Sequence, residues 1–398
     1  MKAQILRTMA ALVAVTAALS TGSLQAESYV ITEVMSGLVT PRGLAFGPDG
    51  GLYVAEAGSG GNGPSIVLGN GNTAFLGATS GLSRLLGGVQ TRVLDGLPSV
   101  ATVAGLDAGG LQDIVFDGAG QAYGLFGLGS NPALRDSNLG AAGAELGTIA
   151  RLSLDGSGIR QHIADVSAHE ATNPDGGGVD SNPFGMARTA AGNFLIADAG
   201  ANDFLQATGA GAVSTLGVLP ATPNPLPFGP PVYQSVPTAI AVGPDGDYYI
   251  GQLTGFPFPP GAANVYRFDP TTAALSVAYS GFTNIVDLTF DDDGNLYVLQ
   301  VSSNGLASPS GPGSGLLLKI DPLTGIRSTI ASTGLVFPGG VVAGPDGTLY
   351  VSNRSNSPSG GQVLSIAAVP EPSSLVLAVA ALAAGAIGGR RMRARRAV

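Results

Sequence analysis

One phrase of the sequence decides the fold, and its clearest copy is PRGLAFGPDGGLYV at residues 41–54. Two further strong copies are PTAIAVGPDGDYYI at residues 237–250 and PGGVVAGPDGTLYV at residues 338–351. Three more diverged copies centre on residues 113–123, 184–196 and 287–298. Each copy indicates a strand, a tight turn and a second strand, because the glycine of the turn tolerates the positive φ that such a reversal needs.

The six copies recur at a spacing that is typical of propeller blades. Their turn glycines are separated by 70, 72, 54, 48 and 53 residues and are Gly50, Gly120, Gly192, Gly246, Gly294 and Gly347. A second hairpin follows in several units, as at 149–154 with 159–163, 264–270 with 275–279 and 316–321 with 326–330. Two hairpins give four strands, and the longer intervals imply loop insertions. We therefore predict an all-β, six-bladed β-propeller of the NHL/TolB-like type over residues 27–368.

The two ends of the repeat region complement each other. After the sixth phrase only one further strand remains, at 362–367, so the last blade is one strand short. A strand at 29–34 precedes the first phrase and has no other place. We predict that this strand is the outer strand of the last blade, which closes the ring and covers a free sheet edge.

Composition excludes several kinds of site. The 398 residues contain 62 Gly and 27 Pro, as many short strands joined by turns require, and no Cys. Disulfides, thiolate metal sites and a Cys nucleophile are therefore excluded.

Residues 1–26 have the order of a signal peptide. Lys2 and Arg7 precede an apolar run at 9–19, and small and polar residues end the segment at Ala26. We expect the mature chain to begin at about residue 27 and to be exported.

Residues 369–398 resemble the PEP-CTERM sorting signal of Gram-negative bacteria. The motif Pro370-Glu371-Pro372 is followed by an apolar stretch at 375–389 and by an Arg-rich end that begins with Arg390 and Arg391. The resemblance implies transient insertion of the tail into the inner membrane, cleavage by an exosortase, and delivery to the outer envelope or extracellular matrix. A plain C-terminal membrane anchor is the alternative, although the apolar stretch is only marginally long enough to span a bilayer.

Removing both terminal segments makes the chain strongly acidic. The N-terminal segment takes two basic residues with it, and the C-terminal tail takes five Arg and one Glu. The remaining 11 basic and 26 acidic residues give a net charge of −15. Such a surface repels phosphate backbones, so no nucleic-acid partner is expected.

Polar residues concentrate in a long insertion at 169–183 and in the phrase end at 197–203. Because propellers bind ligands with loops at the mouth of the central channel, we take these residues, with one from the loop after the fourth phrase, as ligand candidates. They are Glu170, Asn173, Asp175, Asp180, Asn182, Asp198, Asn202 and Gln252. Oxygen ligands in a glycine-rich loop suit Ca²⁺, with Asp175, Asp180 and Asp198 as its candidate ligands. The alternative is that these Asp, Asn and Gly residues simply form turns and caps, so no cofactor is required.

The loops also resemble the ScyD/ScyE family, named for cyanobacterial scytonemin gene clusters. The resemblance lies in 170–183, 198–203, 234–238 and 251–257, and it extends from about residue 30 to 367. It implies an NHL-like propeller and an exported protein, without implying scytonemin synthesis.

Two functions follow as expectations. The first is a non-catalytic extracellular binding or scaffold protein that presents channel-mouth loops to a glycan, a matrix component or a protein partner. The second is a Ca²⁺-dependent lactonase-like or hydrolase-like enzyme with its site at the mouth of the central channel. No residue is assigned a catalytic role.

Overall fold

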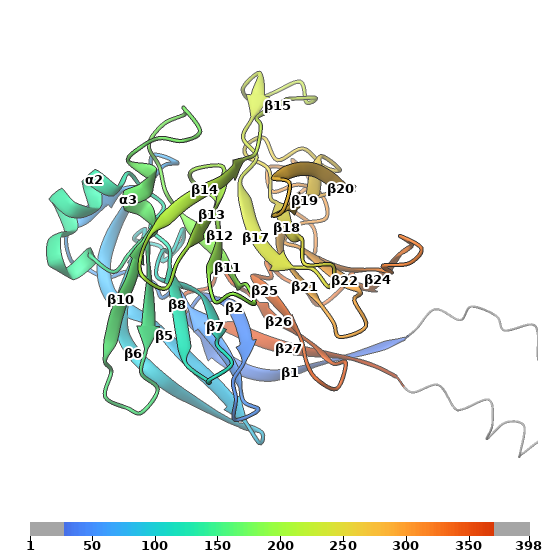
Figure 1. Ribbon diagram of the computed structural model, residues 1–398, viewed down its shortest axis with the longest axis horizontal. Coiled ribbons are helices and arrows are strands. Elements are labelled where there is room, and N and C mark those ends of the chain that lie inside the picture. The colour runs from blue at the N-terminus through green and yellow to red at the C-terminus, as the bar shows by residue number, and fades with distance from the viewer. Residues whose placement is uncertain (1–27, 370–398) are drawn as a thin grey trace, which may run out of the picture. The chain divides into compact units, whose positions relative to one another are not determined.

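The computed structural model describes residues 28–369, and Val30–Ala367 form one compact unit. This unit contains six antiparallel blades (Figure 1). The first three are β2 (Pro41–Phe46), β3 (Leu52–Glu56), β5 (Thr73–Leu86) and β6 (Val89–Ala101); β7 (Leu111–Phe116), β8 (Ala122–Phe126), β9 (Thr148–Leu152) and β10 (Arg160–Asp165); and β11 (Pro183–Arg188), β12 (Phe194–Asp198), β13 (Asp203–Ala207) and β14 (Val213–Val218). The other three are β17 (Pro237–Val242), β18 (Tyr248–Gln252), β19 (Ala263–Asp269) and β20 (Ala274–Phe282); β21 (Ile285–Phe290), β22 (Leu296–Gln300), β23 (Leu316–Ile320) and β24 (Arg327–Ala331); and β25 (Gly340–Ala343), β26 (Leu349–Asn353), β27 (Gly361–Ala368) and β1 (Tyr29–Leu38).

The innermost strands form a closed ring. Each of β2, β7, β11, β17 and β21 contacts the inner strand of the next blade, and β25 contacts β2. Hydrophobic clusters fill the spaces between neighbouring blades. The predicted six-bladed propeller is confirmed.

The N-terminal strand closes the ring as predicted. Strand β1 pairs with β27 at the outside of the last blade, and Figure 1 shows the blue β1 beside the red β27. Met35 and Leu38 of β1 are buried in one cluster with Val54 of the first blade and Val363 of the last. The strand therefore holds the first and last blades together through a shared core as well as through backbone pairing.

The insertions within and between the blades contain short helices and strands of their own. They comprise β4 (Ser65–Val67) in the first blade, α2 (Pro132–Leu134) with a π-helical turn at Arg135–Leu139 and a 3₁₀ turn at Gly140–Gly143, α3 (Val166–Glu170), and the small hairpin of β15 (Thr222–Pro223) and β16 (Val232–Tyr233). Among the described residues, no helix has the length and apolarity that crossing a membrane requires. The predicted signal peptide at 1–26 and the tail from Pro370 onward lie outside the described residues.

The repeated turn has a physical explanation in the blades. The Tyr53 hydroxyl donates to the Asp49 carboxylate at 3.1 Å, so the tyrosine of the second strand holds the aspartate of the turn. Three other blades repeat this bond, between Tyr123 and Asp117, Tyr249 and Asp245, and Tyr297 and Asp291. A tyrosine of the second strand and an aspartate of the turn thus form one contact in four blades. The aspartate directly precedes the turn glycine in the first and fourth blades and lies three residues before it in the second and fifth.

Crowding at the channel axis selects the residue type on the inner strands. The position seven residues before each turn glycine holds Gly43, Asp113, Gly185, Ala239, Asp287 and Gly340. Four of these six residues are small, and the two aspartates stand in the second and fifth blades, opposite each other in the ring. Asp113 accepts the Met186 N–H at 2.7 Å and Asp287 accepts the Val341 N–H at 2.7 Å. Each carboxylate thereby satisfies an edge-strand donor of the next blade.

A methyl group at Gly43 would collide with this arrangement. A Cβ placed there would lie 2.0 Å from Oδ1 of Asp113. Gly43→Ala should therefore lower the free energy of unfolding by about 1–3 kcal/mol, measured by urea denaturation. Gly118→Ala is the matched control, because no atom of the described residues lies within 4 Å of its Cβ position. Equal stability of the two variants would contradict the contact.

Candidate functional site

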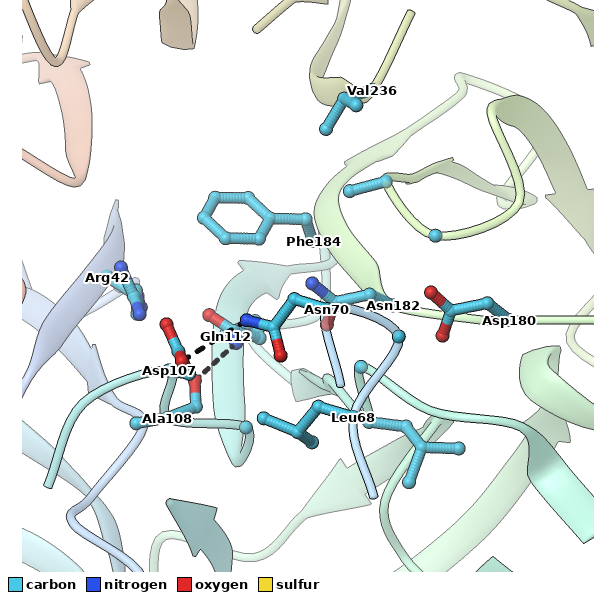
Figure 2. A pocket seen from close by; sticks show the side chains of 16 residues that line it. Arg42, Leu68, Asn70, Asp107, Ala108, Gln112, Asp180, Asn182, Phe184 and Val236 are labelled. Atoms are coloured by element: carbon cyan, nitrogen blue, oxygen red, sulfur yellow. Dashed lines mark hydrogen bonds between the residues drawn. The ribbon is translucent and has the colours of Figure 1, made fainter. Parts of the chain in front are cut away.

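The channel opens at one end into a pocket of about 300 Å³, here called the mouth pocket (Figure 2). The inner strands contribute to it the residue eight positions before the turn glycine, which is Arg42, Gln112 or Phe184 in the first three blades. Loops complete it with Leu68, Asn70, Asp107, Asp180, Asn182 and Val236. The pocket is therefore formed by blades one to three and by the insertions between them.

The pocket has a floor. Below it the channel narrows to a cavity of about 10 Å³ between Asp113 and Asp287. Beyond this waist, a separate cavity of about 410 Å³ is lined by all six inner strands. Burial raises the pKa of Asp287 to about 7, and burial together with Asp287 raises the pKa of Asp113. The waist is too narrow for a ligand of several atoms, so a molecule entering the mouth stops there.

Arg42 is a cation without an ion-pair partner among residues 28–369. Its guanidinium lies 5.5 Å from the centre of the Phe184 ring, and its buried Nε donates no hydrogen bond to this part of the chain. Burial lowers the pKa of Arg42 to about 10, and the Asp107 carboxylate only partly offsets this. Arg42 as a whole is half-buried and lines the pocket, so its guanidinium, which lacks an ion-pair partner among residues 28–369, is suited to bind an anionic group there.

Gln112 offers the complementary group. Its Nε2 donates to the Ala108 carbonyl at 3.1 Å, which fixes the amide, while its buried Oε1 accepts nothing from the described residues. Only 2% of the residue is exposed. Oε1 is therefore an oriented acceptor for a ligand hydroxyl or N–H.

Acidic and amide groups complete the lining. Figure 2 shows Arg42 and Asp107 at one side of the pocket and Asp180 at the other. Burial, with the Asp198 carboxylate, raises the pKa of Asp180 to about 6, and its Oδ1 lacks a hydrogen-bond partner in the described chain. Asp107 is held in place by the side chain of Asn70, which donates to it at 3.2 Å.

The position of the Asp180 carboxylate depends on the close approach of the backbone at Gly69. A Cβ on Gly69 would lie 1.8 Å from Oδ2 of Asp180, so only glycine lets the carboxylate occupy this place. The Gly69 N–H donates to the Gly129 carbonyl at 2.9 Å, which fixes this loop against the second blade. Three segments distant in sequence thus hold one wall of the pocket.

The residues proposed from sequence are separated by the structure. Asp180 and Asn182 line the mouth pocket. Asp198 lies behind it, where its carboxylate accepts from Ser181 and from three backbone N–H groups. Asp175 caps a turn through the Gly177 N–H, and Asn202 bridges to the Val236 N–H.

Three other proposed residues lie apart from the pocket. Gln252 is fully buried between Ser235 and Asn264, and its amide binds both of them. Glu170 and Asn173 belong to a buried polar cluster with Asp203. Within residues 28–369, no three His, Asp or Glu side chains lie close enough together to hold a metal ion by themselves.

Sequence reasoning missed Arg42, Gln112 and Phe184. A signal for them was present, since aligning the six turn glycines places them in one column with Thr238, Val286 and Gly339. Polar, charged and aromatic residues in a column that faces the channel mark the half of the ring that lines the mouth pocket. Asn70 and Asp107 lie in insertions, so they have no equivalent position in the other repeats.

Comparison with known proteins shows the fold. No protein-family model matches the chain, and no curated protein is similar in sequence. Among solved structures, a protein of unknown function from Bacteroides thetaiotaomicron is 10% identical, with a TM-score of 0.52 over 86% of this chain and 76% of that chain. A putative oxidoreductase (glucose dehydrogenase) from Thermus thermophilus is 18% identical, with a TM-score of 0.51 over 85% of this chain and 100% of that one. These similarities support the propeller architecture and leave the activity to be inferred from the mouth pocket.

Proposed function

We propose that the protein is an exported binding protein that takes the acidic sugar units of an extracellular glycan into the mouth pocket. The observation that carries this proposal is the guanidinium of Arg42, unpaired within the described chain, beside a pocket closed at its floor. A ligand carboxylate would supply the anion that Arg42 lacks. This attraction acts at contact distance, whereas salt at about 0.1 M screens the repulsion from the acidic surface beyond about 10 Å.

The remaining groups favour a polyhydroxylated carboxylate over a simple acid. Within residues 28–369, Oε1 of Gln112 and Oδ1 of Asp180 are unpartnered acceptors, which ligand hydroxyls would satisfy. Phe184 offers an aromatic face, against which the C–H face of a sugar ring packs well. A uronic acid combines a carboxylate, hydroxyl donors and an apolar ring face in one unit of suitable size.

Isothermal titration calorimetry on the mature domain tests this proposal. Galacturonate, glucuronate and short oligouronides are titrated beside galactose and glucose, which carry a hydroxymethyl group in place of the carboxylate. We expect saturable binding of the acidic sugars, with the neutral sugars at least roughly tenfold weaker. Equal binding of the two classes, or none by any acidic sugar, would overturn the proposal.

An enzyme at the same mouth is the second candidate. Its support is Asp180, whose pKa of about 6 suits a group that exchanges a proton near neutral pH. The mixtures from the titration, followed by NMR, distinguish the two functions. A binding protein leaves an oligouronide intact, whereas a lyase or hydrolase shortens it.

Export and sorting form the other part of the proposal. The signal peptide at 1–26 and the Pro370-Glu371-Pro372 tail support delivery to the outer envelope or matrix through an exosortase. Intact-mass analysis of the protein from envelope fractions should show a C-terminus near Pro372 that lacks Arg390 and Arg391. A full-length C-terminus would instead favour membrane anchoring by the tail.

A further inference from the structure

Behind the mouth pocket, a cluster of carboxylates lies inside the third blade. Asp198 ends β12 and Asp203 begins β13, and the two residues are direct partners in the strand register. Side chains opposite each other on paired strands lie on one face, about 5 Å apart at Cβ. Both residues are fully buried. Two carboxyl groups therefore lie side by side in the protein interior.

The two carboxylates of this pair differ in the hydrogen bonds that they accept. Asp198 accepts a hydrogen bond from Ser181 at 2.6 Å and three from backbone N–H groups. Neither oxygen of Asp203 accepts a hydrogen bond of normal geometry from the described residues. The nearby Thr215 hydroxyl is in contact with His169 Nε2 at 2.9 Å and only weakly offsets the effect of burial on Asp203. Asp203 is thus a buried carboxylate that lacks a counterpart within this part of the chain.

Glu170, the last residue of α3, faces the same region. It is 2% exposed, and neither of its carboxylate oxygens accepts a hydrogen bond of normal geometry from residues 28–369. The Asp180 N–H is near enough to lower the pKa of Glu170, but this only partly offsets the effect of burial. The neighbouring His169 contacts Thr215 of β14 through its Nε2 at 2.9 Å, so the end of α3 packs against the third blade, which carries Asp203. Four carboxylate oxygens from two elements are therefore buried without a hydrogen bond of normal geometry from the described chain, although buried polar groups are nearly always paired.

Asn173 adds a fifth free oxygen. The Asn173 N–H donates to the Glu170 carbonyl at 2.7 Å, so one tight turn brings these two residues together. The side-chain amide of Asn173 donates to the Gly177 carbonyl at 3.1 Å, and its buried Oδ1 accepts nothing from the residues that the structure describes. A loop with a left-handed residue at Asn173 holds this arrangement.

We propose that Glu170, Asp203 and Asn173 bind one divalent cation, which their all-oxygen donor set identifies as Ca²⁺. No third carboxylate or histidine within residues 28–369 completes a ligand triad, so the amide oxygen is the third protein ligand. Ca²⁺ takes six to eight oxygen ligands, and backbone carbonyls or water supply the others. This set differs from the one that the sequence suggested, because Asp198 already uses its oxygens for four donors.

A bound cation would neutralise the buried carboxylates of Glu170 and Asp203, which are otherwise neutralised by protons. Burial raises the pKa of Glu170 to about 8 and that of Asp203 to about 9, and both groups also feel Asp198 and Asp175. Because the cluster joins the loop of Asn173 to the strands behind the mouth pocket, cation binding would fix the wall that carries Asp180.

Thermal melting of the mature domain at pH 7, after treatment with EDTA and removal of the chelator, tests the proposal with Ca²⁺ alone as the probe. We expect Ca²⁺ to raise the melting temperature saturably, by roughly 5 °C or more at a concentration far above its dissociation constant. Elemental analysis after dialysis should find one Ca²⁺ per chain. Asp203→Asn and Glu170→Gln should each weaken binding at least tenfold. Asp269→Asn, at an exposed turn, should leave binding unchanged.

Two results would overturn the site. The first is a wild-type protein that shows no Ca²⁺-dependent shift at pH 7 and no bound metal, because protons would then be sufficient to neutralise the cluster. The second is a shift of equal size in Asp203→Asn or Glu170→Gln, which would place the cation elsewhere. Because melting and metal content are measured without any sugar, failure of this site is distinguishable from failure of the proposed glycan binding.

Discussion

Replacing Met35 with Asp should lower the melting temperature by roughly 10 °C or more and make unfolding less cooperative. Met35 lies on β1, is 2% exposed, and packs with Val54 of the first blade and Val363 of the last. A charge in this cluster would be buried without a partner, so β1 would leave its place. The last blade would then lose its outer strand and the ring its closure.

Val30→Asp is the matched control for this prediction. Val30 lies on the same strand but is 54% exposed, so an aspartate there stays in water. Circular dichroism melts of the two variants beside the wild-type domain give the comparison. If Met35→Asp melted within two degrees or so of Val30→Asp, β1 would not be needed to close the ring.

Replacing Arg42 with Gln should weaken binding of an acidic sugar by roughly 10- to 100-fold, which is the usual range for losing a hydrogen bond to a charged group. The same change should leave the weak binding of the parent neutral sugar almost unaffected. Loss of discrimination between the two sugars is thus the expected result, because in the proposed complex Arg42 would contact only the carboxylate.

Arg84→Gln is the control for the Arg42 variant. Arg84 pairs with Asp49 at 3.1 Å in the turn of the first blade and does not line the mouth pocket. Like Arg42→Gln, the Arg84→Gln substitution removes one positive charge from the first blade, so any long-range electrostatic effect appears in both variants. Equal loss of affinity in the two variants would assign the effect to net charge and contradict a direct contact.

The architecture followed from the sequence because every blade repeats the same local chemistry. The turn glycines mark six reversals, and the unpaired strand at 29–34 has only one place in a closed ring. Such features depend on residues that are close in the chain or on strict repetition, so they can be recognised in a single sequence.

The site was harder to predict because it depends on what different blades place opposite one another. Asp180 and Asn182 were found as polar loop residues, whereas Arg42 belonged to a phrase that looked only structural. Gln252, which the sequence placed at the mouth, is saturated by its bonds to Ser235 and Asn264. The cluster of Glu170 and Asp203 depends on the packing of α3 against β14 of the third blade, which no local pattern encodes.

A crystal structure of the mature domain with bound oligouronide tests whether the mouth pocket holds a carboxylate through Arg42. We expect a uronate carboxylate within hydrogen-bonding distance of the Arg42 guanidinium, a ligand hydroxyl facing Gln112, and a sugar ring against Phe184. A saccharide bound outside the mouth pocket, or bound there with its carboxylate turned away from Arg42, would contradict it.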